Sequence, residues 1–239
     1  MKKNFRTAVI YFVAAFLLFG IIISVYISEK DEDSKYVYAE KDFQTNSDSR
    51  YSVYGGLMEN LAEKYPDICG WINVKNTKIS YPLLISKDNE YYLRRAYDGS
   101  KDKNGSIIVD YRLNRALTDN QNIILYGHNM ASGNMFAYLA NPKNFTDAEI
   151  EIYSQGVLAV YKPFAAYIEG GNQFIKTAFA DKKELESYIN TALSKSIIQF
   201  KTVPDKEEYI LTLITCEDNF GLNDKRIVIH AVRQELILP

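Results

Sequence analysis

"YILTLITCEDNFGLNDKRIVIHAV" (Tyr209–Val232) contains two short apolar runs, "YILTLITC" and "RIVIHAV", on either side of a polar segment. Both runs are rich in β-branched residues, which favours β-strands. If the two strands are antiparallel neighbours, the end of the first lies beside the start of the second. We therefore expect Cys216 and Arg226 to meet at one rim of a sheet, on either side of a long connecting loop.

Similar short runs recur upstream, separated by Gly, Asn, Asp or Pro. They lie at 70–84, where alternation turns around Asn76, and at 105–112, 122–129, 149–154 and 156–169. Seven or eight such strands, without regularly alternating helices, predict an all-β core in a closed or nearly closed antiparallel barrel.

Two helices are expected beside the strands. "GLMENLAEK" (Gly56–Lys64) has helical spacing and is followed by Pro66, which predicts an N-terminal helical extension. "DKKELESYINTALSKS" (181–196) predicts a helix inserted before the last strands. Its apolar residues fall at helical spacing, and Asp181 with Glu184 resembles a capping box. The simplest interpretation of this apolar face is packing against the barrel.

The N-terminal segment carries a different signal. Residues 7–28, "TAVIYFVAAFLLFGIIISVYIS", contain no charge and would span about 33 Å as a helix, enough for a bilayer core. Lys2, Lys3 and Arg6 precede this run, and an acidic cluster follows it, so we expect the N-terminus inside and the remainder outside. A cleaved signal peptide is the alternative, but the apolar run is long and no small-residue cleavage site is evident.

These features divide the chain into a cytoplasmic tail at 1–6, a transmembrane anchor at 7–28, a polar extracellular stalk at 29–50 and a folded domain at 51–239. The formal net charge of −2 gives no basic footprint for nucleic acid. No His, Cys or acidic cluster has metal-ligand spacing, so we expect no metal and no cofactor.

The chemistry that the sequence suggests centres on Cys216. A fixed positive charge nearby favours the thiolate, and a guanidinium offers several donors to an oxygen that gains charge during acyl transfer. Spacing alone also fits a small buried cysteine, or a disulfide with Cys69, the only other cysteine. For Cys69, in "DICGWINV", packing at a strand start is the expected role.

A base is needed for such chemistry, and the chain has two histidines, His128 and His230. His230 lies four residues past Arg226, about 13 Å along the strand from the rim. His128 follows the run "NIILYG" and opens a loop, which is the usual place for a catalytic side chain. We therefore expect His128 to be the base.

Together, "TLITC", Arg226 in "KRIVIHA" and "YGHNMASGNMF" resemble the sortase family over roughly Ile68 to Val232. The "CED…KR" spacing and the inserted helix are similar to class B sortases. The resemblance implies an eight-stranded β-barrel and a membrane-anchored extracellular cysteine transpeptidase. Such an enzyme cleaves an N-P-x-T-x-like sorting motif near the C-terminus of secreted proteins, through a thioacyl intermediate, and joins it to a peptidoglycan stem or cross-bridge amine.

The resemblance also implies residue roles. Cys216 matches the nucleophile, His128 the general acid/base, and Arg226 the group that stabilises the oxyanion and positions substrate. Asp218 lies where an accessory carboxylate has been considered. Residues that match the substrate groove are Asn89, Leu93, Tyr188, Ile189, Ile214, Thr215 and Glu217.

Three other functions stay open at this point: a cysteine endopeptidase that hydrolyses its acyl-enzyme, a pilus-assembling sortase, and a non-catalytic surface binding module. The product formed with an added amine separates the first from a transpeptidase. A lysine-bearing pilin acceptor distinguishes the second, and an unreactive Cys216 the third. The sequence does not state the exact sorting motif, the acceptor amine or the client proteins.

Overall fold

The computed structural model describes residue 19 and residues 50–170, 175–204, 209–216 and 224–238. From Arg50 onward these residues belong to one compact unit, Asn46–Pro239. Within them, no helix is both long enough and apolar enough to cross a membrane. The predicted tail, anchor and stalk lie outside the described residues, apart from Phe19 and Arg50.

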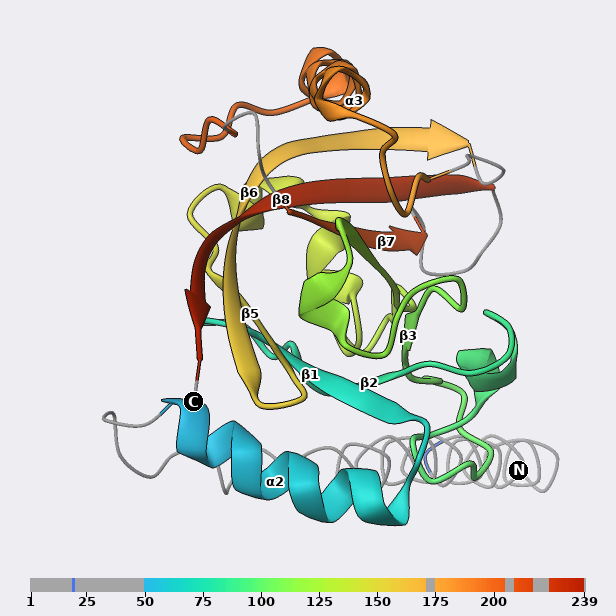
Figure 1. Cartoon of the computed structure of the whole chain (residues 1–239). Coiled ribbons are helices and arrows are strands. Elements are labelled where there is room, and N and C mark those ends of the chain that lie inside the picture. The colour runs from blue at the N-terminus through green and yellow to red at the C-terminus, as the bar shows by residue number, and fades with distance from the viewer. Residues whose placement is uncertain (1–18, 20–49, 171–174, 205–208, 217–223, 239) are drawn as a thin grey trace, which may run out of the picture. The chain divides into compact units, whose positions relative to one another are not determined.

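Eight strands form a closed barrel in the order β1-β2-β3-β4-β7-β8-β6-β5 (Figure 1). Their bounds are β1 Ile68–Val74, β2 Ser80–Leu84, β3 Ile107–Val109, β4 Asn122–Tyr126, β5 Ile150–Ser154, β6 Val157–Gly170, β7 Ile210–Cys216 and β8 Lys225–Ile237. In the connections that the structure describes lie four short 3-10 helices: η1 Tyr91–Arg94, η2 Leu117–Asp119, η3 Ala137–Ala140 and η4 Pro142–Phe145. The predicted all-β barrel is thus confirmed, with the expected turn at Asn76, whose φ is 61°.

The barrel is not wholly antiparallel, which corrects the sequence-based expectation. β2 pairs with β3 in parallel, and β4 pairs with β7 in parallel from Asn122↔Ile210 to Tyr126↔Ile214. A parallel pair needs a long crossover connection, and the segment from β4 to β7 supplies it with β5, β6 and a helix. The remaining pairs are antiparallel, including the long β6–β8 pair.

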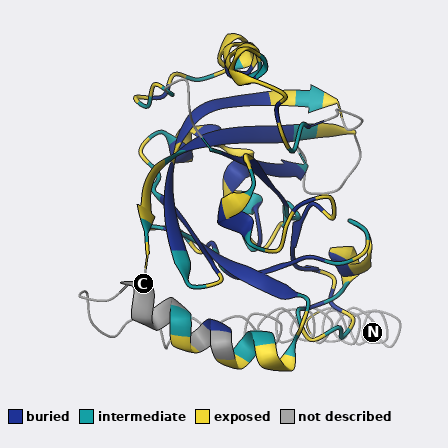
Figure 2. Cartoon of the chain, in the orientation of Figure 1, coloured by how far each residue is buried: buried dark blue, intermediate teal, exposed yellow. Residues whose placement is uncertain are grey.

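The interior of the barrel is filled by apolar side chains, and Figure 2 shows the strands buried along most of their length. The largest fully buried side chains include Trp71, Tyr161, Phe136, Phe145 and Phe164. Burying such aromatic side chains contributes much of the hydrophobic stabilisation of a domain. The residues at the rim of the barrel are therefore supported by a buried, largely apolar interior.

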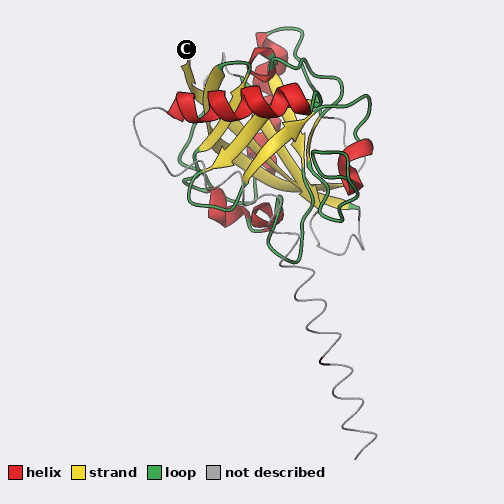
Figure 3. Cartoon of the chain, turned by 90° about the horizontal axis from the view of Figure 1, so that it is seen from below, coloured by secondary structure: helices red, strands yellow, loops and turns green. Residues whose placement is uncertain are grey.

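The N-terminal helix α2 spans Arg50–Lys64 and ends just before Pro66, as predicted. Seen from below, it lies across the strands of the barrel (Figure 3). Met58 on this helix is buried. The helix packs near β1 and so covers one side of the barrel.

The inserted helix α3 spans Lys182–Lys195 between β6 and β7. Asp181 caps it, because its carboxylate accepts a hydrogen bond from the Glu184 amide at 2.8 Å. The Glu184 carboxylate in turn accepts from the Ala180 amide at 2.7 Å. In a standard capping box it would accept from the amide of the N-cap residue Asp181, so the predicted arrangement forms with the donor shifted by one residue. The face that carries Leu185, Ile189 and Ala192 is buried.

His230 on β8 lies in the core with no exposed surface. Its Nδ1 is 2.9 Å from the Thr212 hydroxyl, and its Nε2 is 2.9 Å from the Tyr167 hydroxyl. Thr212 donates to the Asn122 side-chain oxygen at 2.8 Å, so its hydroxyl has no proton left for His230. His230 must therefore donate through Nδ1–H and accept the Tyr167 hydroxyl at Nε2.

This buried chain of hydrogen bonds joins β4, β7, β8 and β6. It continues beyond β4, because the Asn122 side-chain amide donates to the Lys176 carbonyl at 2.7 Å. Every partner of His230 is neutral, and burial lowers the pKa of His230 to about 3. His230 is thus a neutral structural residue in the barrel wall. This placement agrees with the choice of His128 as the candidate base.

Stability should fall as the pH is lowered from 7.5 to 5. An unfolded histidine titrates near pH 6.5, whereas His230 stays neutral down to about pH 3, so the unfolded chain binds the extra proton in this window. Linkage predicts a loss of about 2 kcal/mol in the free energy of unfolding between these two pH values, measured by urea denaturation. Asp110 and Glu184 also have lowered pKa values. Protonation of these two carboxylates reduces stability only at more acidic pH.

A His230→Gln variant is the control for this prediction. It should be less stable than the wild type at pH 7.5 but should lose most of the pH dependence between 7.5 and 5. An undiminished pH dependence in the variant would assign the effect to other groups.

Candidate active site

Two parallel strands bring His128 and Cys216 to the same rim of the barrel. Tyr126 at the end of β4 pairs with Ile214 on β7, and the Gly127 amide donates to the Ile214 carbonyl at 3.1 Å. His128 and Cys216 each lie two residues beyond this matched pair. Because parallel strands point the same way, both residues emerge at the same end of the barrel.

The antiparallel partner of β7 brings Arg226 to the same place. Cys216 pairs with Arg226 in the β7–β8 register, which confirms the neighbouring positions predicted from the sequence. The guanidinium Nη1 donates to the Lys225 carbonyl at 3.0 Å, and the Arg226 side chain is half-buried. One strand, β7, thus carries the thiol with a histidine on one side and an arginine on the other.

The loop after His128 is tied down on both sides. The Asn129 side-chain amide donates to the Cys216 carbonyl at 3.2 Å, and the Phe136 amide donates to the His128 carbonyl at 2.9 Å. Gly127 is required for steric reasons, because a Cβ there would lie 2.7 Å from the buried Phe136 ring and 2.7 Å from Ile107. The glycine of the "YGHN" motif therefore lets the chain pass close to the core before it presents His128.

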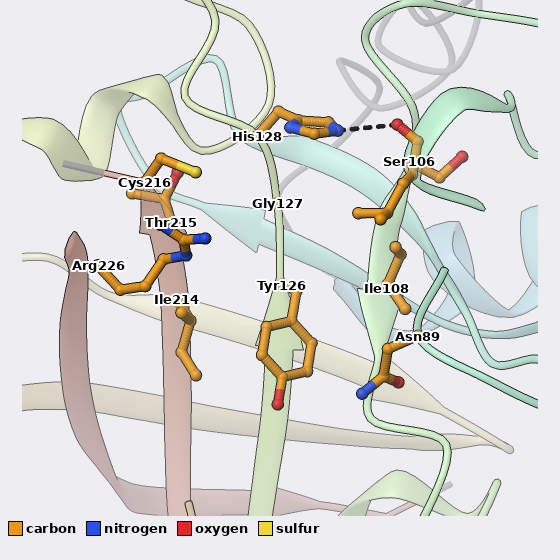
Figure 4. A pocket seen from close by; sticks show the side chains of 11 residues that line it. Asn89, Ser106, Ile108, Tyr126, Gly127, His128, Ile214, Thr215, Cys216 and Arg226 are labelled. Atoms are coloured by element: carbon orange, nitrogen blue, oxygen red, sulfur yellow. Dashed lines mark hydrogen bonds between the residues drawn. The ribbon is translucent and has the colours of Figure 1, made fainter. Parts of the chain in front are cut away.

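These residues surround a pocket of about 350 Å³. Figure 4 shows Cys216 and Arg226 on one side, Asn89, Ser106 and Ile108 on the other, and His128 and Tyr126 between them. The lining consists of Asn89, Leu93, Ser106, Ile108, Tyr126, Gly127, His128, Ile214, Thr215, Cys216 and Arg226. A nucleophile, a titratable ring and a fixed cation around one cavity can support acyl transfer.

Four of the seven predicted groove residues line this pocket: Asn89, Leu93, Ile214 and Thr215. The Asn89 side-chain oxygen accepts from the Tyr111 amide at 2.9 Å, which fixes the orientation of the side chain. Glu217 and Asp218 lie outside the described residues. Their predicted roles therefore stay predictions.

The structure does not bring Tyr188 and Ile189 to the pocket. Ile189 is buried on the inner face of α3, and the Tyr188 ring packs edge-on against His230 with ring centroids 5.4 Å apart. Burial raises the pKa of Tyr188 to about 12. Both side chains serve the packing of α3 on the barrel, and the sequence-based assignment of these two residues to the groove is corrected accordingly.

Sequence reasoning missed four residues of the pocket, namely Ser106, Ile108, Tyr126 and Gly127. Tyr126 is held by Asp110, whose carboxylate accepts from the Tyr126 hydroxyl at 2.9 Å and from two Arg112 nitrogens at 2.8 Å each. Burial opposes ionisation of Asp110, but these hydrogen bonds outweigh it and lower its pKa. "DYR" (110–112), at the end of the predicted strand at 105–112, is the sequence signal available for this cluster.

Among the described residues, no three His, Cys, Asp or Glu side chains come together in a way that could hold a metal ion.

Comparison with known proteins gives consistent matches. The family profile described as a sortase domain matches residues 72–234. Sortase B of Staphylococcus aureus is 30% identical over 237 residues, with 97% of each chain covered. Sortase B of Listeria monocytogenes is 30% identical over 209 residues, covering 83% of this chain and 81% of that protein.

Solved structures agree with these sequence matches. A mutant form of Clostridium perfringens sortase B has a TM-score of 0.74 at 31% identity and covers 84% of this chain and 97% of its own. A Staphylococcus aureus sortase B–substrate complex has a TM-score of 0.76 at 27% identity and covers 87% of this chain and 99% of its own. The similarity therefore extends over most of the chain.

The two cysteines are both free thiols but differ in their surroundings. Cys69 is buried beside β2, and its thiol is 3.5 Å from the Leu83 carbonyl. Burial raises the pKa of Cys69 to about 12, although Arg115 partly opposes the shift. Cys216 is half-buried and faces the pocket.

Iodoacetamide at pH 8 should therefore alkylate Cys216 but not Cys69 in the native full-length chain, because alkylation needs an accessible thiolate. Both cysteines should react after unfolding in guanidinium chloride. Peptide mass spectrometry measures each site, and the native Cys216→Ala variant should remain unlabelled. Labelling of Cys69 as fast as Cys216 in the native chain would contradict this assignment.

Proposed function

The chain belongs to the sortase family and is a cysteine transpeptidase of the class B sortase type, and on that premise we propose that Cys216, His128 and Arg226 carry its reaction. The observation that supports this proposal is the register of β7. It is parallel to β4 and antiparallel to β8, so these three side chains border one pocket. The substrate is a protein with a sorting motif of N-P-x-T-x type.

In the first half-reaction, the Cys216 thiolate attacks the carbonyl carbon of the motif Thr. The tetrahedral oxyanion is stabilised by the Arg226 guanidinium, whose planar set of donors suits an oxygen that gains negative charge. His128, as imidazolium, protonates the leaving amine as the C–N bond breaks. The product of this step is a thioester between Cys216 and Thr.

In the second half-reaction, an amine of a peptidoglycan stem or cross-bridge peptide attacks the thioester. His128 accepts a proton from the attacking nitrogen, and Cys216 leaves as a thiolate. The half-buried position of Cys216 at the edge of the pocket lets a second substrate approach the thioester. An amide bond at the Thr carboxyl results.

The full-length chain in detergent should cleave an N-P-x-T-x peptide after Thr, and an added peptidoglycan-like amine should divert the product to a Thr amide. Acid quenching should trap a thioester on Cys216, detected by mass spectrometry. Some hydrolysis is expected as well, because water at about 55 M competes with an amine that lacks its full set of contacts.

Other outcomes of the same assay point to other functions. Free Thr acid as the only product, across a panel of stem-peptide amines, would favour a hydrolase. Transfer only to a pilin lysine would favour pilus assembly. No cleavage of any sorting-type peptide, with Cys216 unreactive, would favour a binding module.

Substitutions in this assay separate the roles of the three residues. Cys216→Ala and His128→Ala should abolish transfer, and Arg226→Lys should lower kcat by about 10²-fold or more, since an ammonium lacks the fork of donors. Cys69→Ser and Arg233→Lys are matched controls away from the pocket and should keep most of the activity. An active His128→Ala variant would remove His128 from the mechanism.

Sortases are cell-envelope enzymes, and we propose that residues 7–28 anchor this one in the cell membrane with its N-terminus in the cytoplasm and the catalytic domain outside. The uncharged run and the three preceding basic residues support this orientation. Protease added to intact protoplasts should digest the domain. Complete protection would refute the orientation, and release of a shortened chain into the medium would indicate a cleaved signal peptide.

A further inference from the structure

We propose that the main-chain carbonyl of Leu93 orients the catalytic ring of His128, and that Gly105 is the positioning residue that allows this carbonyl to reach the ring. The inference rests on the acid/base role proposed above for His128. It adds to that role a fixed tautomer of the ring, in which Nδ1 is the nitrogen that exchanges protons with the substrates.

The contact itself is a hydrogen bond of 2.8 Å between His128 Nε2 and the Leu93 oxygen. A carbonyl oxygen can only accept, so Nε2 must carry the proton. In the neutral ring, Nδ1 then has a free lone pair. Figure 4 shows the ring with its bonded nitrogen turned away from Cys216 and its other nitrogen on the Cys216 side.

The Leu93 carbonyl is held in place by the segment around it. The Ser106 amide donates to the Tyr92 carbonyl at 3.1 Å, and the Asp102 amide donates to the Arg94 carbonyl at 3.1 Å. The carbonyls of the residues on either side of Leu93 thus accept hydrogen bonds from within the β2–β3 connection. The Leu93 carbonyl between them is directed at His128.

Gly105 packs directly under this carbonyl. A Cβ at position 105 would lie 2.4 Å from the Leu93 oxygen and 2.9 Å from the Tyr92 oxygen. These neighbours are main-chain atoms, so they cannot swing aside as a flexible side chain would. Only a residue without a side chain lets the Leu93 carbonyl keep its position.

The chemical consequence concerns which nitrogen exchanges protons. As imidazolium, His128 gives the Nδ1 proton to the leaving amine while the C–N bond breaks, and the ring remains neutral with Nε2–H on Leu93. The Nδ1 lone pair then takes a proton from the incoming amine as its nitrogen bonds to the Thr carbonyl carbon and the thioester C–S bond breaks. The ring ends as imidazolium and Cys216 as thiolate, so each turnover returns both groups to their starting forms.

The tautomer can be measured without any substrate. The chain has two histidines, and the buried network around His230 requires its Nδ1–H form. Nitrogen NMR of the ¹⁵N-histidine-labelled full-length chain, above about pH 8 where ordinary imidazoles are neutral, should show opposite tautomers. His128, assigned by its loss in His128→Ala, should be protonated at Nε2, and an Nδ1–H form of His128 would overturn the proposal.

Gly105→Ala tests the steric part, with Gly99→Ala as its matched control. Both glycines lie in the same connection and have positive φ, 62° and 81°, so alanine strains the backbone at both. At Gly99, however, the nearest atom to an added Cβ is the Tyr91 hydroxyl at 3.9 Å. The two variants therefore differ in whether they displace the Leu93 carbonyl.

Turnover of the sorting peptide by Gly105→Ala should show kcat reduced at least about tenfold with KM within about twofold, because a misplaced acid/base slows chemistry more than binding. Its His128 signal should lose the single Nε2–H form, and alkylation of Cys216 should be unchanged. Gly99→Ala should keep kcat within about twofold.

A folded Gly105→Ala variant with the kcat and tautomer of Gly99→Ala would overturn the proposal. If Gly105→Ala does not fold, the tautomer of His128 in the wild-type chain alone decides whether the proposal holds. Transpeptidation by His128→Ala would instead refute the proposed acid/base role of His128. The tautomer of His128 is measured without substrate, so that result would not change.

Discussion

Strand β7 is hydrogen-bonded along both of its edges, and the site depends on this one constraint. Its parallel register with β4 aligns Tyr126 with Ile214, and its antiparallel register with β8 aligns Cys216 with Arg226. A slip of one residue on either side would turn the following side chains to the opposite face. The buried side chains of β7 prevent such a slip, because six of its seven residues are buried and only Cys216 is half-buried.

The same registers hold the polar interior of the barrel wall. Thr212 lies between Asn122 on β4 and His230 on β8, and this chain can be satisfied only when all three strands are in register. A buried polar network with one member displaced would leave an unpaired group in the core, which is costly. The two histidines therefore have different roles. His230 helps to fix the register of the strands, and this register places His128 at the rim of the barrel.

The sequence predicted those parts of the fold that depend on local pattern. The β7–β8 pair, the turn at Asn76 and the cap of α3 follow from alternation, turn chemistry and an acidic capping residue. The parallel β4–β7 pair was missed, because its strands are separated by more than eighty residues and no turn signal joins them. The assignment of Tyr188 and Ile189 to the groove failed for a related reason. Helical spacing shows that a face is apolar, but not which surface covers it.

The orientation of His128 could not be predicted from residue types at all. Where a carboxylate orients a histidine, the Asp or Glu is visible in the sequence and can itself be protonated. Here the acceptor is the main-chain oxygen of Leu93, which any residue type at that position would supply equally. What the sequence encodes is Gly105, through the absence of a side chain 2.4 Å from that oxygen. Because a carbonyl does not ionise, the acceptor for Nε2–H is the same whether the His128 ring is neutral or protonated. The ring can therefore change its charge through Nδ1 without losing the contact that holds it.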